Sequence, residues 1–83
     1  MQQDAQQRRN EARHAQSLLL KGREAALRGE LDSAIVLLEQ AAEQMPDSAD
    51  AVEELARIIY MRGDVLRAAE LFDRALRLRQ ERE

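Results

Sequence analysis

Residues 29–41 read GELDSAIVLLEQA, and residues 63–75 read GDVLRAAELFDRA. The two stretches begin 34 residues apart and carry the same residue types at matched positions. The matched pairs are Gly29 and Gly63, Ala34 and Ala68, Leu37 and Leu71, Leu38 and Phe72, and Ala41 and Ala75. Self-similarity at one fixed offset indicates a repeated structural unit. The sequence therefore predicts a duplicated motif of about 34 residues.

Outward from this repeat, the few helix breakers divide the chain into four predicted helices. Gly and Pro occur only at Gly22, Gly29, Pro46 and Gly63, and helices commonly end at or near such residues. The predicted helices run from about Asp4 to Arg28, from an N-cap near Asp32 to just before Pro46, from Asp47 or Ser48 to Gly63, and from Asp64 to the C-terminus. Connections of two to five residues make consecutive helices antiparallel.

The composition supports an all-α chain. The protein has 83 residues and a mass of 9.5 kDa, which suits one small domain. Apolar residues make up 45% of the chain and charged residues 35%, and the strong helix formers Ala, Leu, Glu, Arg and Gln dominate both groups. Phe72 and Tyr60 are the only aromatic residues. This composition excludes sheet folds and predicts a thin core between helices that pack through small residues.

The apolar residues of the second and fourth predicted helices have helical periodicity. In the earlier of these two helices an arc of about 160° holds Ala34, Ile35, Leu37, Leu38, Ala41, Ala42 and Met45. In the last helix an arc of about 180° holds Ala68, Ala69, Leu71, Phe72, Ala75, Leu76 and Leu78. A helix with a single neighbour needs a stripe of only about 100°. We therefore expect the last helix to be covered by something besides the third.

A 34-residue helix-turn-helix period resembles the tetratricopeptide repeat family. The opening pattern of that family falls on Leu18, Lys21, Gly22 and Ala25, and again on Val52, Leu55, Ala56 and Ile59. Its second-helix pattern falls on Ala34, Leu38, Ala41 and Pro46, and then on Ala68, Phe72 and Ala75, with Gln80 in place of Pro. The resemblance implies two helical hairpins, at residues 15–48 and 49–82 of a domain spanning 15–83, in a short right-handed α-solenoid.

Residues 1–14 precede the repeats and are expected to form either an N-terminal extension of the first helix or a frayed tail. Ala5 and Ala12 are their only apolar residues apart from Met1. Arg8, Arg9 and Arg13 could touch a nucleic-acid backbone, but interleaved acidic residues and the lack of a nearby aromatic favour a solvated helix. Whether residues 1–14 form an ordered helix or a frayed tail is left open.

The resemblance also implies a concave groove lined by the first helix of each repeat, which relatives use to hold a peptide or helix of a partner protein. It places Arg23 and Arg57 at equivalent positions there. The other predicted groove residues are Gln16, Leu19, Ala26, Leu27, Asp50, Glu53, Tyr60 and Met61. Because Arg binds carboxylates and Tyr and Met supply contact area, the groove is predicted to bind an acidic or amphipathic segment. The alternative is that both Arg residues are solvated or paired with nearby Glu residues.

No set of residues with catalytic or metal-binding chemistry is found in the sequence. Glu11 and His14 have the Glu-x-x-His spacing of di-iron bundles, but those need a second such pair and there is no second His. Asp47, Asp50 and Glu53 lack the turn Gly of calcium loops, and their charges suit a helix N-terminus. With no Cys and no nucleophile next to a base, we expect no enzyme activity, metal or cofactor.

Charge and hydropathy limit the partners and the compartment. A net charge of −3 and a pI near 5.2 disfavour binding to nucleic acid or to a membrane surface. No apolar run in the sequence approaches the length needed to span a bilayer. We therefore expect a cytoplasmic protein, and the use of twelve Arg against one Lys favours a GC-rich bacterial source.

The leading hypothesis is a non-catalytic protein-interaction module that binds its partner in the groove. The rival hypothesis is a structural module that forms a weak homodimer, or a fragment of a longer repeat protein, with the last helix as its docking surface. In that view Phe72 and Ala75 pack inward on the third helix. Leu71, Leu76 and Leu78 then lie partly toward the side where a further repeat would dock.

Overall fold

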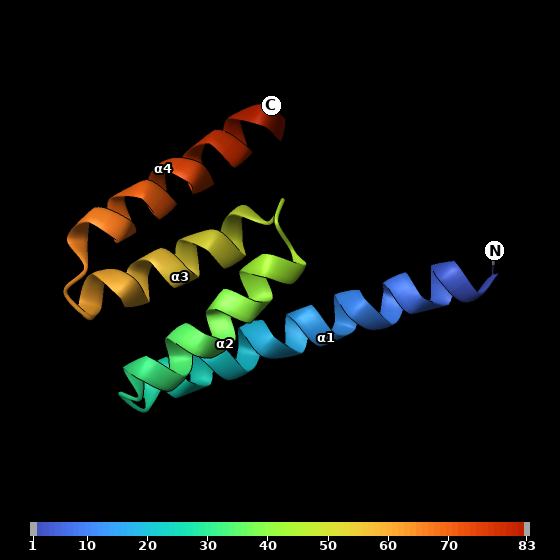
Figure 1. Cartoon of the computed structure of the whole chain (residues 1–83), viewed down its shortest axis with the longest axis horizontal. Helices are drawn as coiled ribbons and strands as arrows, with labels where there is room; N and C mark the ends of the chain where they lie inside the picture. Colours follow the sequence, from blue (N-terminus) through green and yellow to red (C-terminus); the bar gives the residue numbers. More distant parts are fainter. Residues whose placement is uncertain (1, 83) are drawn as a thin grey trace.

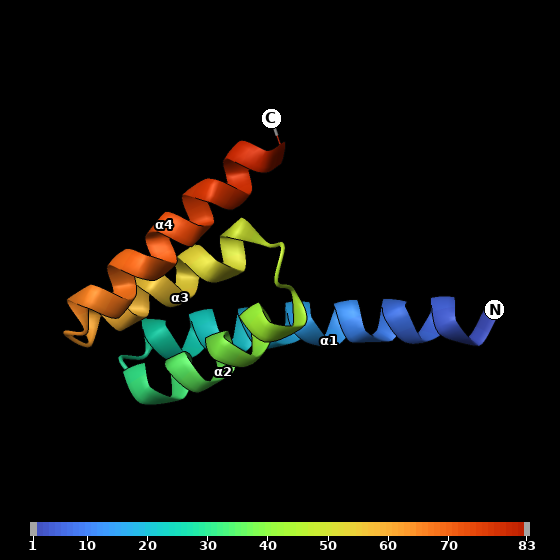
Figure 2. The same ribbon diagram turned by 45° about the horizontal axis from the view of Figure 1, so that its top comes forward.

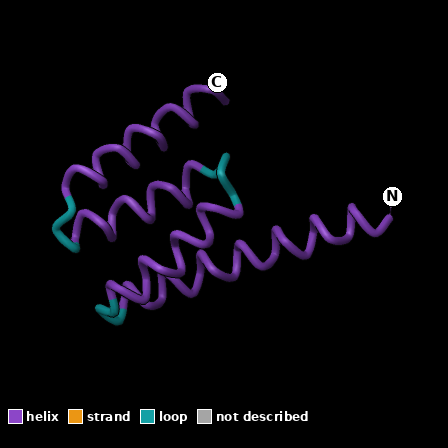
Figure 3. The backbone as a smooth tube through the Cα atoms, viewed as in Figure 1, coloured by secondary structure: helices purple, strands orange, loops and turns teal. Residues whose placement is uncertain are grey.

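The protein is all-α. The computed structural model describes residues 2–82, and within that range it contains four helices and no strand. The helices are α1 (Gln2–Leu27), α2 (Leu31–Gln44), α3 (Ala49–Met61) and α4 (Val65–Arg82), and three short loops join them (Figure 3). The helices predicted from the Gly and Pro positions are confirmed, with boundaries within a few residues of those expected.

The helices pack in chain order as two hairpins. α1 packs against α2, α3 packs against α4, and the contact between α2 and α3 joins the two hairpins. Figures 1 and 2 show α4 at one edge of this stack and the hairpin of α1 and α2 at the other, with the C-terminal ends of α1 and α3 on the same side. α2 therefore has two close neighbours, whereas α4 packs against α3 alone.

Both hairpin turns use the same backbone motif. After α1, the Gly29 amide donates to the Ala26 carbonyl and the Glu30 amide donates to the Ala25 carbonyl. After α3, Gly63 and Asp64 repeat these two bonds 34 residues later, to Tyr60 and Ile59. This is the Schellman motif, whose turning residue is left-handed. Gly29 has φ of 79° and Gly63 has φ of 102°, which explains glycine at both positions.

The start of α2 differs from the prediction. Its N-cap is Glu30, whose side chain makes no capping hydrogen bond, and Asp32 lies inside the first turn. There Asp32 Oδ1 accepts a hydrogen bond of 2.7 Å from Arg62 Nε. The Schellman turn explains the shift, because it fixes residue 30 as the point where the chain enters the next helix. The other two helices begin where predicted and have side-chain caps: Ser48 accepts from the Ala51 amide and Asp64 from the Arg67 amide.

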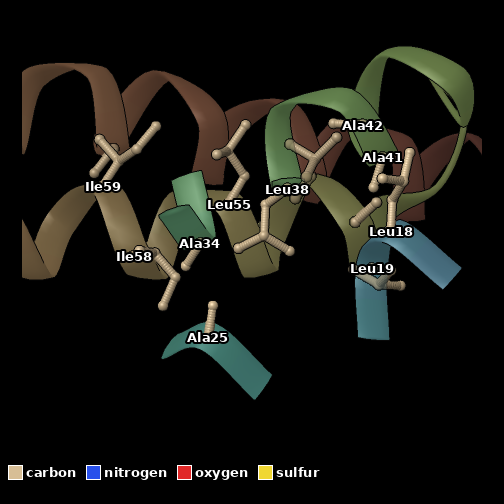
Figure 4. Close-up of a cluster of buried hydrophobic side chains, with 14 residues drawn as sticks. Leu18, Leu19, Ala25, Ala34, Leu38, Ala41, Ala42, Leu55, Ile58 and Ile59 are labelled. Atoms are coloured by element: carbon tan, nitrogen blue, oxygen red, sulfur yellow. The ribbon is translucent and has the colours of Figure 1, made fainter. Parts of the chain in front are cut away.

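The core lies between the helices and is built largely from alanine and leucine. Figure 4 shows part of it, with side chains from α1, α2 and α3. α1 and α2 approach each other closely at Gly22, where an added Cβ would stand 2.7 Å from Leu38 Cγ and Cδ2. The buried residues of this core cluster are Leu18, Leu19, Ala25, Ala34, Leu38, Ala41, Ala42, Ala51, Val52, Leu55, Ile58, Ile59, Ala68 and Ala75.

Residues 4–14 continue α1 as a helix and stay outside the core. All of their side chains are exposed, and this part of α1 projects beyond the other helices (Figure 1). Burial in α1 begins at Ala15.

The side chains of α4 are oriented differently from the prediction. Leu71 and Leu78, expected to face partly outward, are half-buried and pack against the core. Phe72, expected to pack inward, is 37% exposed, and Leu76 is 54% exposed. Ala75 is buried as predicted. The reason is angular: Leu71, Ala75 and Leu78 share one face of the helix, and Phe72 and Leu76 lie about 110° away from it.

Candidate partner-binding surface

The predicted groove residues of α1 and α3 are mostly exposed or half-exposed, with one exception. Leu19 is 4% exposed and belongs to the core, so it is not available to a partner. Gln16 is exposed and Ala26 half-buried. We define the α1–α3 strip by seven of the other predicted residues: Arg23, Leu27, Asp50, Glu53, Arg57, Tyr60 and Met61.

Charged residues in the middle of the strip are linked across the two helices. Arg23 Nε of α1 lies 3.4 Å from Glu54 Oε1 of α3, and Arg57 Nη1 lies 3.8 Å from the same oxygen. Arg57 Nη2 also lies 3.5 Å from Glu53 Oε2. Because the two Arg side chains remain 42% and 56% exposed, these pairs hold the guanidinium groups in place while leaving donors open to solvent.

The acidic end of the strip is bound by α4. Arg79 donates to both carboxylate oxygens of Glu53, at 3.2 and 3.0 Å, and to Asp50 Oδ1 at 3.3 Å. These hydrogen bonds lower the pKa of the Glu53 carboxyl, with a further contribution from the positive charge of Arg57. The same contacts raise the pKa of Arg79. Asp50 and Glu53 are therefore already engaged within the protein.

The sequence-based site did not include Arg79 or Glu54. The 34-residue offset relates Gln16 to Asp50 and Met45 to Arg79, but only the structure shows that these positions are in contact. In the first repeat Gln16 Nε2 contacts Met45 Sδ at 3.6 Å, so the same two positions are joined in both repeats. In the second repeat an ion pair replaces a weak polar contact.

The other end of the strip is apolar and exposed. Leu27 is the last residue of α1 and Met61 the last of α3, and they occupy the same position in the two repeats. Leu27 is 88% exposed, and Tyr60 and Met61 are 58% and 62% exposed. Three large apolar or amphipathic side chains therefore stand in water near the C-terminal ends of the parallel helices α1 and α3.

The described residues show no competing site of another kind. Within residues 2–82 no group of three or more His, Cys, Asp or Glu residues is placed to hold a metal ion. Among the four helices, none combines the length and hydropathy needed to cross a membrane. The Glu11 and His14 pair lies on the exposed part of α1.

The fold and the repeated contacts define a helical-repeat protein. The tetratricopeptide repeat family model matches residues 25–83. The match covers most of the chain and includes α2, α3 and α4, so the chain belongs to the tetratricopeptide repeat family. Comparison with curated proteins and with solved structures gave no match. Repeats of this family are typically non-catalytic modules for protein–protein interaction, which is the general function that membership indicates.

Proposed function

We propose that this protein binds a segment of a partner protein along the α1–α3 strip. The main supporting observation is the pairing of both Arg side chains of the strip with one oxygen of Glu54. This contact orients Arg23 and Arg57 together while leaving about half of each exposed. Two positioned guanidinium groups can donate hydrogen bonds to carboxylates or backbone carbonyls of an incoming chain.

The apolar end of the strip supplies the second part of the proposed interface. Tyr and Met are favoured in interfaces because they provide a large contact area, and Met adapts to different partners. Leu27, Tyr60 and Met61 are exposed at this end. The partner that fits is an amphipathic segment with acidic residues toward the Arg pair and apolar residues toward the ends of α1 and α3.

The test compares the wild type with a double variant that carries both Arg23→Gln and Arg57→Gln. Glutamine is preferred to glutamate here because a negative charge beside Glu53 and Glu54 would disturb α3 itself. A partner recovered from the source cell by pull-down is purified and titrated against both proteins by calorimetry. We expect the double variant to lose about 1.5 to 3 kcal/mol of binding free energy for each charge-assisted contact removed.

The matched control is Arg8→Gln with Arg9→Gln, which removes the same charge from the exposed part of α1. It should bind as wild type does. Equal affinity of the wild type and the strip variant, with unchanged helicity by circular dichroism, would contradict the proposed site.

A further inference from the structure

The outer face of α4 carries an apolar stripe that no described residue covers. Its members are Val65, Ala69, Phe72 and Leu76, at spacings of four, three and four residues. All four are exposed, and Val65 and Leu76 are more than half exposed. At about 100° per residue these side chains fall within a narrow arc, so they form one continuous line along the helix.

The first repeat shows what such a stripe does when a neighbour is present. The residues 34 positions earlier, on α2, are Leu31, Ile35, Leu38 and Ala42. Leu38 is 0% and Ala42 is 7% exposed, while their equivalents Phe72 and Leu76 are 37% and 54% exposed. α2 packs against both α1 and α3, whereas α4 has only α3 beside it. The α4 stripe therefore repeats, in register, an apolar surface that a second helix covers in α2.

The other edge of the stack is not built to receive this stripe. α3 presents Ala51, Leu55 and Ile58 as buried residues on one face, and Leu55 and Ala42 line the same depression between α2 and α3. The equivalents in α1 are Ser17, Lys21 and Glu24, which are polar and exposed or half-exposed. Stacking α1 of one copy on α4 of another would bury these polar groups without partners, which is unfavourable. Head-to-tail growth into a filament is thus disfavoured.

The stripe is instead complementary to itself. Its spacing reads the same in both directions, as an antiparallel pair of identical helices requires. With the two-fold axis between residues 70 and 71, Phe72 of one copy lies opposite Ala69 of the other, and Val65 lies opposite Leu76. The largest side chain then meets the smallest, which is the arrangement that fills space between packed helices.

We propose that two copies of this chain associate through their α4 helices, antiparallel about a two-fold axis, by burying the stripe of Val65, Ala69, Phe72 and Leu76. The contact is isologous and closes at two copies. It lies on a different helix from the Arg pair of the α1–α3 strip, so it does not depend on the proposed function. Because the contact rests on four side chains per copy, fewer than the roughly 20 to 30 residues a side of a standard interface, we expect a weak dimer, with a dissociation constant on the order of 10 to 100 µM.

Sedimentation equilibrium tests the association directly. Wild type should form a concentration-dependent dimer, and Leu76→Glu should raise its dissociation constant at least about tenfold, because a carboxylate would be buried without a partner. Leu20→Glu is the control, since Leu20 is 56% exposed, close to the 54% of Leu76, but lies on α1, and its dimer should match wild type. A wild type that stays monomeric up to about 1 mM would overturn the proposal and leave the stripe to a helix of another protein.

Cross-linking tests the geometry, and the absence of cysteine in the chain removes any background. Val65→Cys and Leu76→Cys chains are mixed and oxidised. The antiparallel pairing predicts that the mixed disulfide dominates. Two copies of Val65→Cys would have their thiols about 16 Å apart along the axis, at about 1.5 Å per residue, beyond the reach of a disulfide. Dominant 65–65 and 76–76 products would overturn the antiparallel arrangement.

Discussion

Alanine at repeated positions determines how closely the paired helices approach. Ala41 and Ala75 are equivalent in the two repeats and are 0% and 1% exposed. A methyl group is the largest side chain that such close helix contacts accept without a shift of the backbone. The 34-residue recurrence of alanine is thus a packing requirement, whereas alanine in residues 4–14 meets no such limit.

The first prediction compares a buried and an exposed alanine. Ala41→Leu should lower the free energy of unfolding by about 1 to 3 kcal/mol, because the added methylenes overpack the core. Ala5→Leu should change it little, since Ala5 is exposed. Urea denaturation followed by circular dichroism measures both, and equal midpoints would show that the register of the repeat is wrong.

The second prediction concerns the left-handed turn after α3. An added Cβ at Gly63 has no atom within 4 Å, so only the backbone conformation opposes substitution there. Gly63→Ala should cost about 1 to 2 kcal/mol, the usual penalty for an L residue held left-handed. Gly63→Asn should cost less, because asparagine tolerates this conformation. The same denaturation experiment checks the order, and alanine as stable as asparagine would contradict it.

At the scale of the helices, α3 and α4 are joined by an ion pair as well as by their apolar faces. Arg79 near the end of α4 binds Glu53 in α3 through two hydrogen bonds. Because this contact lowers the pKa of Glu53 in the folded state, the stabilisation is present above the ordinary carboxyl pKa. It is lost as the pH falls through the lowered, folded-state value.

The third prediction follows from this pH dependence of the Glu53–Arg79 pair. Arg79→Gln should be less stable than wild type at pH 7, and the difference should shrink as the pH falls below the ordinary carboxyl pKa and through the lowered pKa of folded Glu53. Urea midpoints of the two proteins between pH 3 and pH 7 measure the effect. Arg77→Gln is the control, since Arg77 pairs only within α4, with Asp73. A difference between wild type and Arg79→Gln that did not depend on pH would rule out Glu53 as the partner that matters.

The helices could be predicted from the sequence because their ends depend on local chemistry. Gly29, Gly63 and Pro46 act within one turn of the backbone, and the repeat offset relates Gly29 to Gly63 independently. The direction in which α4 turns its side chains could not be predicted in the same way. An apolar arc of about 180° allows several orientations, and only the position of α3 decides that Leu71 and Leu78 pack inward while Phe72 does not.

The candidate site was predictable to a similar degree. The repeat placed Arg23 and Arg57 at equivalent positions, and the structure shows that both contact Glu54. The burial of Leu19 and the contacts of Arg79 depend on where neighbouring helices lie. A single sequence gives the residue types but not which of them come into contact. Two opposite charges 26 residues apart could each pair with several other charged residues, so their pairing does not follow from the sequence.

The whole molecule combines a packed stack of helices with a projecting segment of α1. Its principal extents are 45 × 31 × 15 Å, and residues 4–14 would contribute about 16 Å of helix at the usual rise. Every side chain of the segment is exposed, and burial begins at Ala15. The hydrogen bond from Gln7 to Glu11 within the segment is local and 3.5 Å long.

The last prediction is that this segment can be removed without loss of the fold. Deleting residues 1–11 takes away no buried side chain among those described, so the thermal midpoint should change by less than about 2 °C while the ellipticity per molecule falls. Deleting residues 1–18 also removes Ala15 and Leu18, which are 0% and 6% exposed. The loss of a buried leucine and its neighbours should lower the midpoint by about 10 °C or more. If the shorter deletion were as damaging as the longer one, residues 4–14 would have to contribute to the core through contacts other than burial of their side chains.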